Sequence, residues 1–173
     1  LADLDGRVHL ILDSGPATVG LESTVLDLTA DPPRVLRPGP ISPGVLANVL
    51  GMGVDHGPVA ADSGHLASPG LLAVHYAPRT RAVRIPSPAH LADFDRPARF
   101  GLMAFEPIPD ALRLKPVAAS IEPDPAVAAR DFYRALRDLD SRGLDLIIAV
   151  EPPEGPEWDA LRDRLRRATT PHA

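Results

Sequence analysis

Polar side chains that could bind an anionic ligand stand at the ends of two short predicted strands. Ser23 and Thr24 start a strand predicted over residues 23–28, and Arg37 ends the next one over residues 34–37. Hydroxyl groups beside a strand start can bind a carboxylate or a phosphate, and the planar fork of an arginine suits a phosphate. Glu22 lies directly before this group. These residue types indicate a binding site at the strand ends.

A third polar pair, His75 and Tyr76, lies in a segment over residues 68–78 that we interpret as a lid. Prolines restrict the backbone at both ends of this segment, and Gly70 allows one sharp bend. Several apolar side chains accompany the pair, whereas a passive linker is usually polar and flexible. A tyrosine carried by such a lid can cover a bound base. The alternative is a buried connector in which Tyr76 only fills a domain interface.

Two other interpretations of these side chains remain open. Ser23 and Thr24 could satisfy backbone groups while Arg37 pairs with an acid. A hydrolase triad could be built from Ser23, His75 and Asp27, although no nucleophile elbow surrounds the serine.

Charge and composition argue against several functional classes. A formal charge of -5 and a pI near 5.6 are not typical of a chain dominated by nucleic-acid binding. The absence of cysteine excludes disulfides and thiolate sites, and the six histidines show no metal-ligand spacing. Neither a signal peptide nor a long apolar run is visible, so the cytoplasm is the expected location.

Short apolar runs separated by turn residues predict the elements of the first half. Residues 8–12 predict a buried strand before an Asp-Ser-Gly-Pro turn, and the strands over residues 23–28 and 34–37 follow. A helix is predicted between its N-cap, Ser42, and its stop, Gly51. The strand ends named above are thus the places where these elements turn.

The second half alternates strands with helices, which predicts a small open α/β sheet with helices packed against it. Strands are predicted over residues 82–85, 99–105, 117–119 and 146–150. The last of these is apolar throughout, as expected for a strand covered on both faces. An amphipathic helix is predicted from its N-cap, Asp124, to Gly143.

The last helix is predicted to begin near Pro156 and to bury one apolar stripe. The stripe consists of Trp158, Leu161, Leu165 and Ala168. Its basic residues are Arg162, Arg164, Arg166 and Arg167. Because positive charge suits the C-terminal end of a helix, we interpret this arginine run as a solvated face.

Several motifs taken together resemble the Sua5 family of threonylcarbamoyl-AMP synthases. They are Gly-Leu-Glu-Ser-Thr-Val-Leu-Asp-Leu-Thr over residues 20–29, Leu-Arg-Pro-Gly over 36–39, Ser-Pro-Gly over 68–70 and His-Tyr-Ala-Pro over 75–78. Residues 131–140 and 164–168 resemble the C-terminal domain of that family. The implied fold class is α/β, with the C-terminal portion of a YrdC-like domain, an extended linker and a small Rossmann-like open-sheet Sua5 domain.

The resemblance also implies domain boundaries. Residues 1–51 would be the C-terminal part of the YrdC-like catalytic domain, 52–80 the interdomain linker or lid, and 81–173 the Sua5-type domain. The Pro-Thr-Glu-Thr-like, Lys-x-Arg and Ser-Ala-Asn segments of the family have no counterpart here. We therefore expect a fragment that is inactive in isolation, and we expect its first unit to expose an apolar face or a sheet edge.

The implied activity joins L-threonine, bicarbonate and ATP into threonylcarbamoyl-AMP and pyrophosphate, for t6A biosynthesis at position 37 of tRNA. The resemblance implies that Ser23 contacts threonine and that Arg37 and Tyr76 contact ATP, with Thr24 and His75 as further candidates. It assigns no catalytic side chain. Mg²⁺ would arrive with ATP, and downstream tRNA-modifying enzymes would be partners.

Functions from other classes remain as alternatives. One is a non-catalytic RNA-binding module, which rests only on the terminal arginine run and is opposed by the acidic balance of the chain. Another is a ligand-binding regulatory module derived from the same family.

Overall fold

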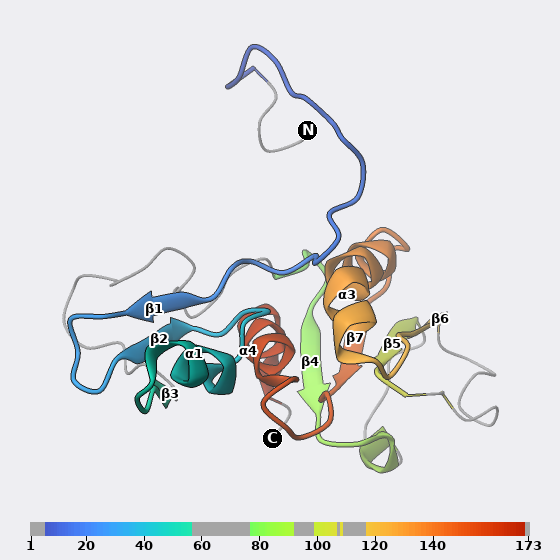
Figure 1. The fold of residues 1–173 in the computed structure, drawn as a ribbon. Coiled ribbons are helices and arrows are strands. Elements are labelled where there is room, and N and C mark those ends of the chain that lie inside the picture. Colours follow the sequence, from blue (N-terminus) through green and yellow to red (C-terminus); the bar gives the residue numbers. More distant parts are fainter. Residues whose placement is uncertain (1–5, 57–76, 92–98, 107, 109–116, 172–173) are drawn as a thin grey trace.

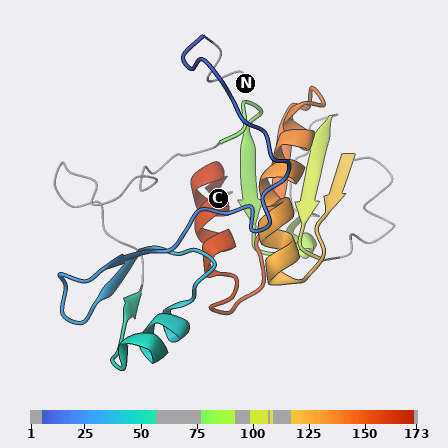
Figure 2. The ribbon, with the colours of Figure 1, turned by 45° about the horizontal axis from the view of Figure 1, so that its top comes forward.

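The structure is a computed structural model, and it describes residues 6–56, 77–91, 99–106, 108 and 117–171 of the 173-residue chain. Its strands form two sheets, one within residues 25–56 and one within residues 82–171 (Figures 1 and 2). The predicted lid pair, His75 and Tyr76, lies outside the described residues, as does most of the predicted linker.

The first sheet contains three short strands. In spatial order they are β1 (Val25–Asp27), β2 (Arg34–Arg37) and β3 (Asp55–His56). β1 and β2 are antiparallel, whereas β2 and β3 are parallel. The strand predicted over residues 34–37 is confirmed, and the one predicted over 23–28 is shorter than expected.

The first helix, α1 (Pro43–Leu50), forms where the sequence predicts it. The Ser42 hydroxyl accepts a hydrogen bond from the amide of Val45, and proline occupies the first helical position. Gly51 ends the helix with φ 67°, a left-handed conformation that glycine adopts without a steric penalty.

Residues 8–12 do not form the predicted buried strand. They carry no strand structure, and their side chains are exposed, with Leu12 87% and Leu10 76% accessible. The segment runs away from both sheets (Figure 1). A strand needs hydrogen bonds from a neighbouring strand, and β1 pairs only with β2 among the described strands. The apolar run alone was therefore a misleading signal.

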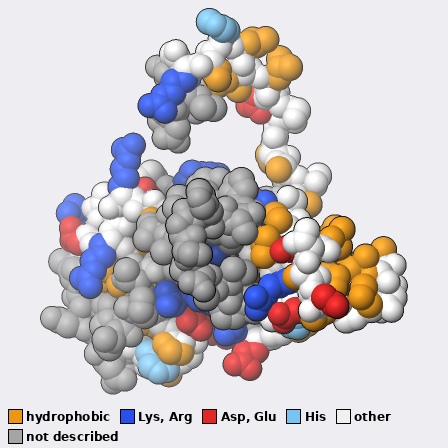
Figure 3. Space-filling view, turned by 90° about the vertical axis from the view of Figure 1, so that its left-hand side faces the viewer, with side chains coloured by type: hydrophobic (Ala, Val, Ile, Leu, Met, Phe, Trp, Pro, Cys, Tyr) orange, Lys and Arg blue, Asp and Glu red, His pale blue; other side chains and the backbone are white. Residues whose placement is uncertain are grey.

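Most apolar side chains of the first unit are open to solvent. Among the residues of its three strands, only Val35 is buried. The exposed large apolar side chains within the described ranges are Val8, Leu10, Ile11, Leu12, Val19, Leu28, Ile41, Val45, Val49, Leu50 and Met52. Figure 3 shows such side chains on the N-terminal segment at the top of the view. The expectation of an exposed apolar face is confirmed.

The second sheet contains five strands, and every pair of neighbours is parallel. Its strands are β4 (Ala82–Ile85), β5 (Phe100–Ala104), β6 (Val117–Ser120), β7 (Leu146–Val150) and β8 (Thr170–Pro171), in the spatial order β6-β5-β7-β4-β8. The predicted open sheet is confirmed. The edge strand β8 was not predicted, because two residues give no periodic signal.

Strand β7 is covered on both faces, as its apolar sequence predicts. Ile147 and Ala149 pack in a core with residues of α3 (Pro125–Asp140) and α4 (Asp159–Ala168). Leu146, Ile148 and Val150 of β7 pack in a second core with Leu91 of the short 3₁₀ helix η1 (Pro88–Leu91). No helix of the described residues combines the length and the apolar character needed to cross a membrane.

The two units touch where residues 17–22 pass α3 and where β1 and β2 approach α4, which lies on the side of the five-stranded sheet that faces the first unit (Figures 1 and 2). Gly20 permits the first approach. It has φ 77°, and a Cβ at this position would lie 2.5 Å from Cα of Arg130. Only glycine therefore fits between this segment and the helix.

Helix α3 begins at the predicted N-cap. The Asp124 carboxylate accepts hydrogen bonds from the amides of Ala126 and Val127, both at 2.9 Å, and Pro125 is the first helical residue. The helix ends at Asp140, and its C-cap, Ser141, lies two residues before the predicted stop, Gly143.

We expect Asp124→Ala to lower the stability of the second unit by about 1 kcal/mol, since two amides at the start of α3 lose their acceptor. For a chain of this size the melting temperature should fall by about 2–4 °C. Fluorescence of Trp158, the single tryptophan and a buried residue of the same core, reports the transition. Glu122→Ala removes a nearby exposed carboxylate and is the control. An equal loss in both variants would show that the cap contributes nothing specific.

Candidate functional site

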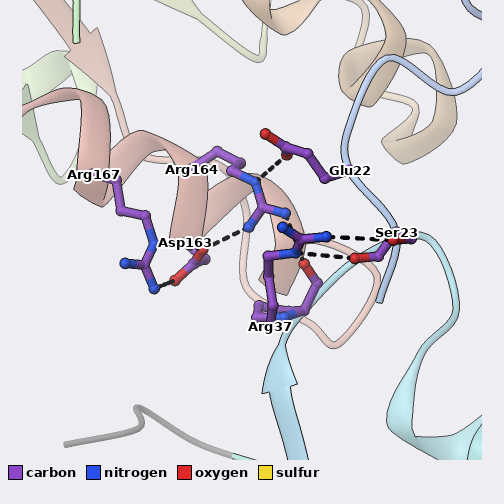
Figure 4. Close-up of polar contacts among 7 residues, drawn as sticks. Glu22, Ser23, Arg37, Asp163, Arg164 and Arg167 are labelled. Carbon is purple, nitrogen blue, oxygen red and sulfur yellow. Dashed lines mark hydrogen bonds and ion pairs between the residues drawn. The ribbon is translucent and has the colours of Figure 1, made fainter. Parts of the chain in front are cut away.

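Ser23 and Arg37 meet at the joined ends of β1 and β2. The Arg37 side chain donates from Nε to the Ser23 carbonyl at 3.1 Å and from Nη2 to Ser23 Oγ at 3.3 Å (Figure 4). Arg37 is opposite Val25 in the antiparallel register, which places it beside the start of β1. The two predicted site residues are thus in contact, while their roles toward a substrate remain predictions.

The hydroxyl of Thr24 is used within the fold. It donates to the Ile41 carbonyl at 2.9 Å and accepts from the Ile41 amide at 3.1 Å, so it ties the start of β1 to the turn before α1. The interpretation that Thr24 satisfies backbone groups is therefore confirmed.

The hydrolase triad gains no support from this geometry. Ser23 Oγ accepts from a guanidinium, which stays protonated and cannot serve as a general base. Asp27 accepts from the Thr29 amide at 2.8 Å and from the Thr29 hydroxyl at 2.6 Å. His75, the third member, lies outside the described residues.

Gly39 allows the backbone after Arg37 to approach the backbone of residues 22–24. A Cβ on Gly39 would lie 2.7 Å from the carbonyl carbon of Ser23 and 2.8 Å from the carbonyl oxygen of Glu22. Atoms this close would have to move apart, so a side chain here would separate the two strand ends.

Arg164 of α4 is not part of a solvated face, and that prediction is wrong. Its side chain is only 4% exposed, and it donates from Nε to Glu22 at 2.6 Å and from Nη2 to the Pro38 carbonyl at 3.2 Å. Its Nη1 pairs with Asp163 at 2.6 Å (Figure 4). A buried guanidinium needs such partners, because an unpaired buried charge is strongly unfavourable.

Other arginines of the run are also engaged within the chain. Arg167 pairs with Asp163 at 3.0 Å, and Arg162 donates to the carbonyls of Pro152 and Pro153 at 3.3 Å. Arg166 is exposed. The run is therefore much less available to RNA than its sequence suggests.

Sequence reasoning missed the role of Arg164, although its spacing carried a signal. Arg164 follows Leu161 by three residues and precedes Ala168 by four, which places it on the buried side of α4. The four arginines cannot all lie on one face of a helix. Arg164 is the one that lies on the same face as the apolar stripe and is therefore buried.

The electrostatics of Glu22 follow from this contact. Partial burial raises the pKa of the Glu22 carboxyl. The hydrogen bond from Arg164, a backbone hydrogen bond, and the positive charges of Arg164 and Arg37 outweigh burial, so the pKa lies below its ordinary value. Glu22 is thus ionised at neutral pH and holds its arginine partner.

A cavity of about 670 Å³ lies beside this segment, and neither Ser23 nor Arg37 lines it. Its walls are residues 17–22, Ala77, Pro78, Tyr133, Leu136, Arg137 and Asp140. Ser23 and Arg37 therefore lie outside the cavity between the first unit and α3. Within the described ranges, no three His, Asp or Glu side chains are grouped as metal ligands.

Comparisons with known proteins agree on one family. Residues 41–170 match the sequence family described as threonylcarbamoyl-AMP synthase, C-terminal domain. A threonylcarbamoyl-AMP synthase of Pyrococcus abyssi is 30% identical over an alignment that covers 96% of this chain and 51% of that protein. One of Bacillus subtilis is 33% identical over an alignment that covers 96% of this chain and 50% of that protein.

A solved structure shows the same fold. The crystal structure of P. abyssi Sua5 complexed with L-threonine superimposes with a TM-score of 0.75 at 25% identity, over 97% of this chain and 52% of that chain. The chain spans about half the length of the curated relatives it matches.

Glu22→Gln should destabilise the protein in a pH-dependent way. The pKa of Glu22 is depressed in the fold, so its contribution is complete above its unfolded pKa of about 4.3 and is lost as pH falls through the lower folded value. Urea unfolding at pH 7 should show the variant less stable by about 1 kcal/mol, a figure reduced for the partial exposure of the carboxyl. The difference should shrink toward pH 3. A pH-independent difference would mean that the carboxylate charge is not what stabilises this contact.

Proposed function

The chain belongs to the Sua5 family of threonylcarbamoyl-AMP synthases, and on that premise we propose that it takes part in making L-threonylcarbamoyl-AMP and pyrophosphate from L-threonine, bicarbonate and ATP. The product would supply t6A biosynthesis at position 37 of tRNA in the cytoplasm. Its consumers would be downstream enzymes that transfer the threonylcarbamoyl group to tRNA.

The observation that carries the proposal is the contact between Ser23 and Arg37 at the ends of β1 and β2. We assign threonine binding to Ser23 and ATP binding to Arg37. A P. abyssi relative has been solved with L-threonine, which supports an amino-acid site in the family. Tyr76 would add a contact to ATP, with Thr24 and His75 near the same ligands.

This arrangement suits a reaction that needs positioning more than a protein nucleophile. The threonine amine combines with bicarbonate to form a carbamate and water, and a carbamate oxygen then attacks the α-phosphorus of ATP. The bond from the α-phosphorus to the bridging oxygen breaks, and pyrophosphate leaves with its electron pair. A guanidinium oriented by Ser23 offsets negative charge on the phosphates, and the fixed strand ends keep the reactants together.

Mg²⁺ would enter with ATP as part of the substrate. Mg²⁺ usually keeps several water ligands and binds through one or two carboxylates together with substrate phosphates. Among the described residues, no three or more metal-ligating side chains are grouped together.

The activity is proposed for the whole protein rather than for these 173 residues. Because the chain spans about half the length of its relatives, we expect the isolated chain to be inactive. The alternative of an RNA-binding module loses its main support, since Arg164, Arg167 and Arg162 are engaged within the fold.

We expect Arg37→Ala in the whole protein to raise the Michaelis constant for ATP by roughly tenfold to a hundredfold, which corresponds to about 1.5–3 kcal/mol of charge-assisted hydrogen bonding. Ser23→Ala should act mainly on threonine, by about fivefold for a contact of about 1 kcal/mol. Pyrophosphate release at varied ATP and threonine measures both.

Arg34→Ala is the matched control, because Arg34 lies on the same strand and pairs with Asp55 at 3.2 Å, away from Ser23. It should leave both constants within twofold of wild type. If Arg37→Ala lowers the melting temperature but changes neither constant, Arg37 is a structural residue and the assignment fails.

A further inference from the structure

Arg164 of α4 contacts two residues of the first unit. Its guanidinium is 4% exposed and contacts Glu22 at 2.6 Å and the Pro38 carbonyl at 3.2 Å. Glu22 and Pro38 are far from Arg164 in sequence, by 142 and 126 residues. Figure 4 shows this side chain next to the Ser23–Arg37 pair.

The two residues that Arg164 holds bracket the candidate site. Glu22 directly precedes Ser23, and Pro38 directly follows Arg37. One planar guanidinium therefore binds both strand ends that carry the site residues, one through a carboxylate and one through a backbone carbonyl. Movement of either end by about 1 Å would break a hydrogen bond to a buried charge, which is costly.

The guanidinium is itself held in place. Asp163 accepts from Arg164 Nη1 at 2.6 Å and also pairs with Arg167, one turn further along the helix, at 3.0 Å. The neighbours Leu161 and Leu165 are each 1% exposed and belong to the core under α4. We call the Arg164 guanidinium together with its acceptors Glu22 and Pro38 the clamp. Its arginine lies on a rigid element of the second unit.

We propose that Arg164 is a positioning residue for the synthase reaction, through which the C-terminal unit sets the geometry of Ser23 and Arg37. The proposal rests on the proposed function, because it takes Ser23 and Arg37 as the groups that bind threonine and ATP. In this proposal Arg164 acts on the ligands through the two strand ends that it binds. Its effect is to fix the distance and orientation of the two strand ends.

The kinetic test compares Arg164→Met with Arg166→Met in the whole protein. Both remove one positive charge from the same helix, but Arg166 is exposed. Arg164→Met should raise the Michaelis constants for ATP and for threonine together, each on the order of tenfold, whereas Arg166→Met should change neither. A purely structural residue would reduce the amount of folded enzyme, which lowers the maximal rate but not a Michaelis constant measured on the enzyme that remains folded.

Hydrogen–deuterium exchange gives a second readout that does not depend on activity. Amides in peptides over residues 20–24 and 36–40 should exchange faster in Arg164→Met than in wild type, and at the wild-type rate in Arg166→Met. If the wild-type protein forms no threonylcarbamoyl-AMP, the proposed function fails, and exchange alone decides whether the clamp exists.

Arg164→Lys keeps a positive charge and serves if the methionine variant does not fold. An ammonium group lacks the fork that binds Glu22 and Pro38 at once, so both Michaelis constants should rise by a smaller factor. Wild-type constants in an active, folded Arg164 variant would overturn the proposal, as would unchanged exchange in both peptides.

Discussion

The ion pair between Arg164 and Glu22 joins two units that otherwise differ in packing. The second unit has buried cores on both faces of its sheet, whereas the described part of the first unit exposes more than half of its large apolar side chains. A guanidinium removed from water must be met by acceptors, and these come from Glu22, Pro38 and Asp163. The requirement to satisfy one buried charge therefore fixes where the ends of β1 and β2 lie against α4.

This constraint gives the C-terminal unit a physical connection to the candidate site. Arg37 and Ser23 hold each other at the strand ends, and Gly39 lets the backbones come close enough for that contact. Arg164 then anchors both strand ends from outside. Through Arg164, helix α4 of the second unit contacts the residues next to Ser23 and Arg37 in the first unit.

Features with strong local signals could be predicted from the sequence. The apolar run of β7, the N-cap Asp124 and the Ser42–Gly51 helix all formed as expected, because capping chemistry and hydrophobic pattern act over a few residues. The strand predicted over residues 8–12 does not form, because a strand also needs a neighbouring strand to pair with and local composition does not show whether one is present.

The candidate site was predictable only in part. The convergence of Ser23 and Arg37 followed from their places at neighbouring strand ends, whereas the burial of Arg164 depended on an acceptor 142 residues away. Arg164 is the buried residue of the arginine run, and in the sequence only its spacing to Leu161 and Ala168 distinguishes it from the other three arginines.

Direct contact between Glu22 and Arg164 couples the two units. A double-mutant cycle tests it most directly, with Glu22→Gln, Arg164→Met and the combined variant compared by urea unfolding at pH 7. The structure predicts a coupling free energy of about 1–2 kcal/mol, because removing either partner forfeits the same charge-assisted hydrogen bond. Additive effects, with a coupling below about 0.3 kcal/mol, would contradict it.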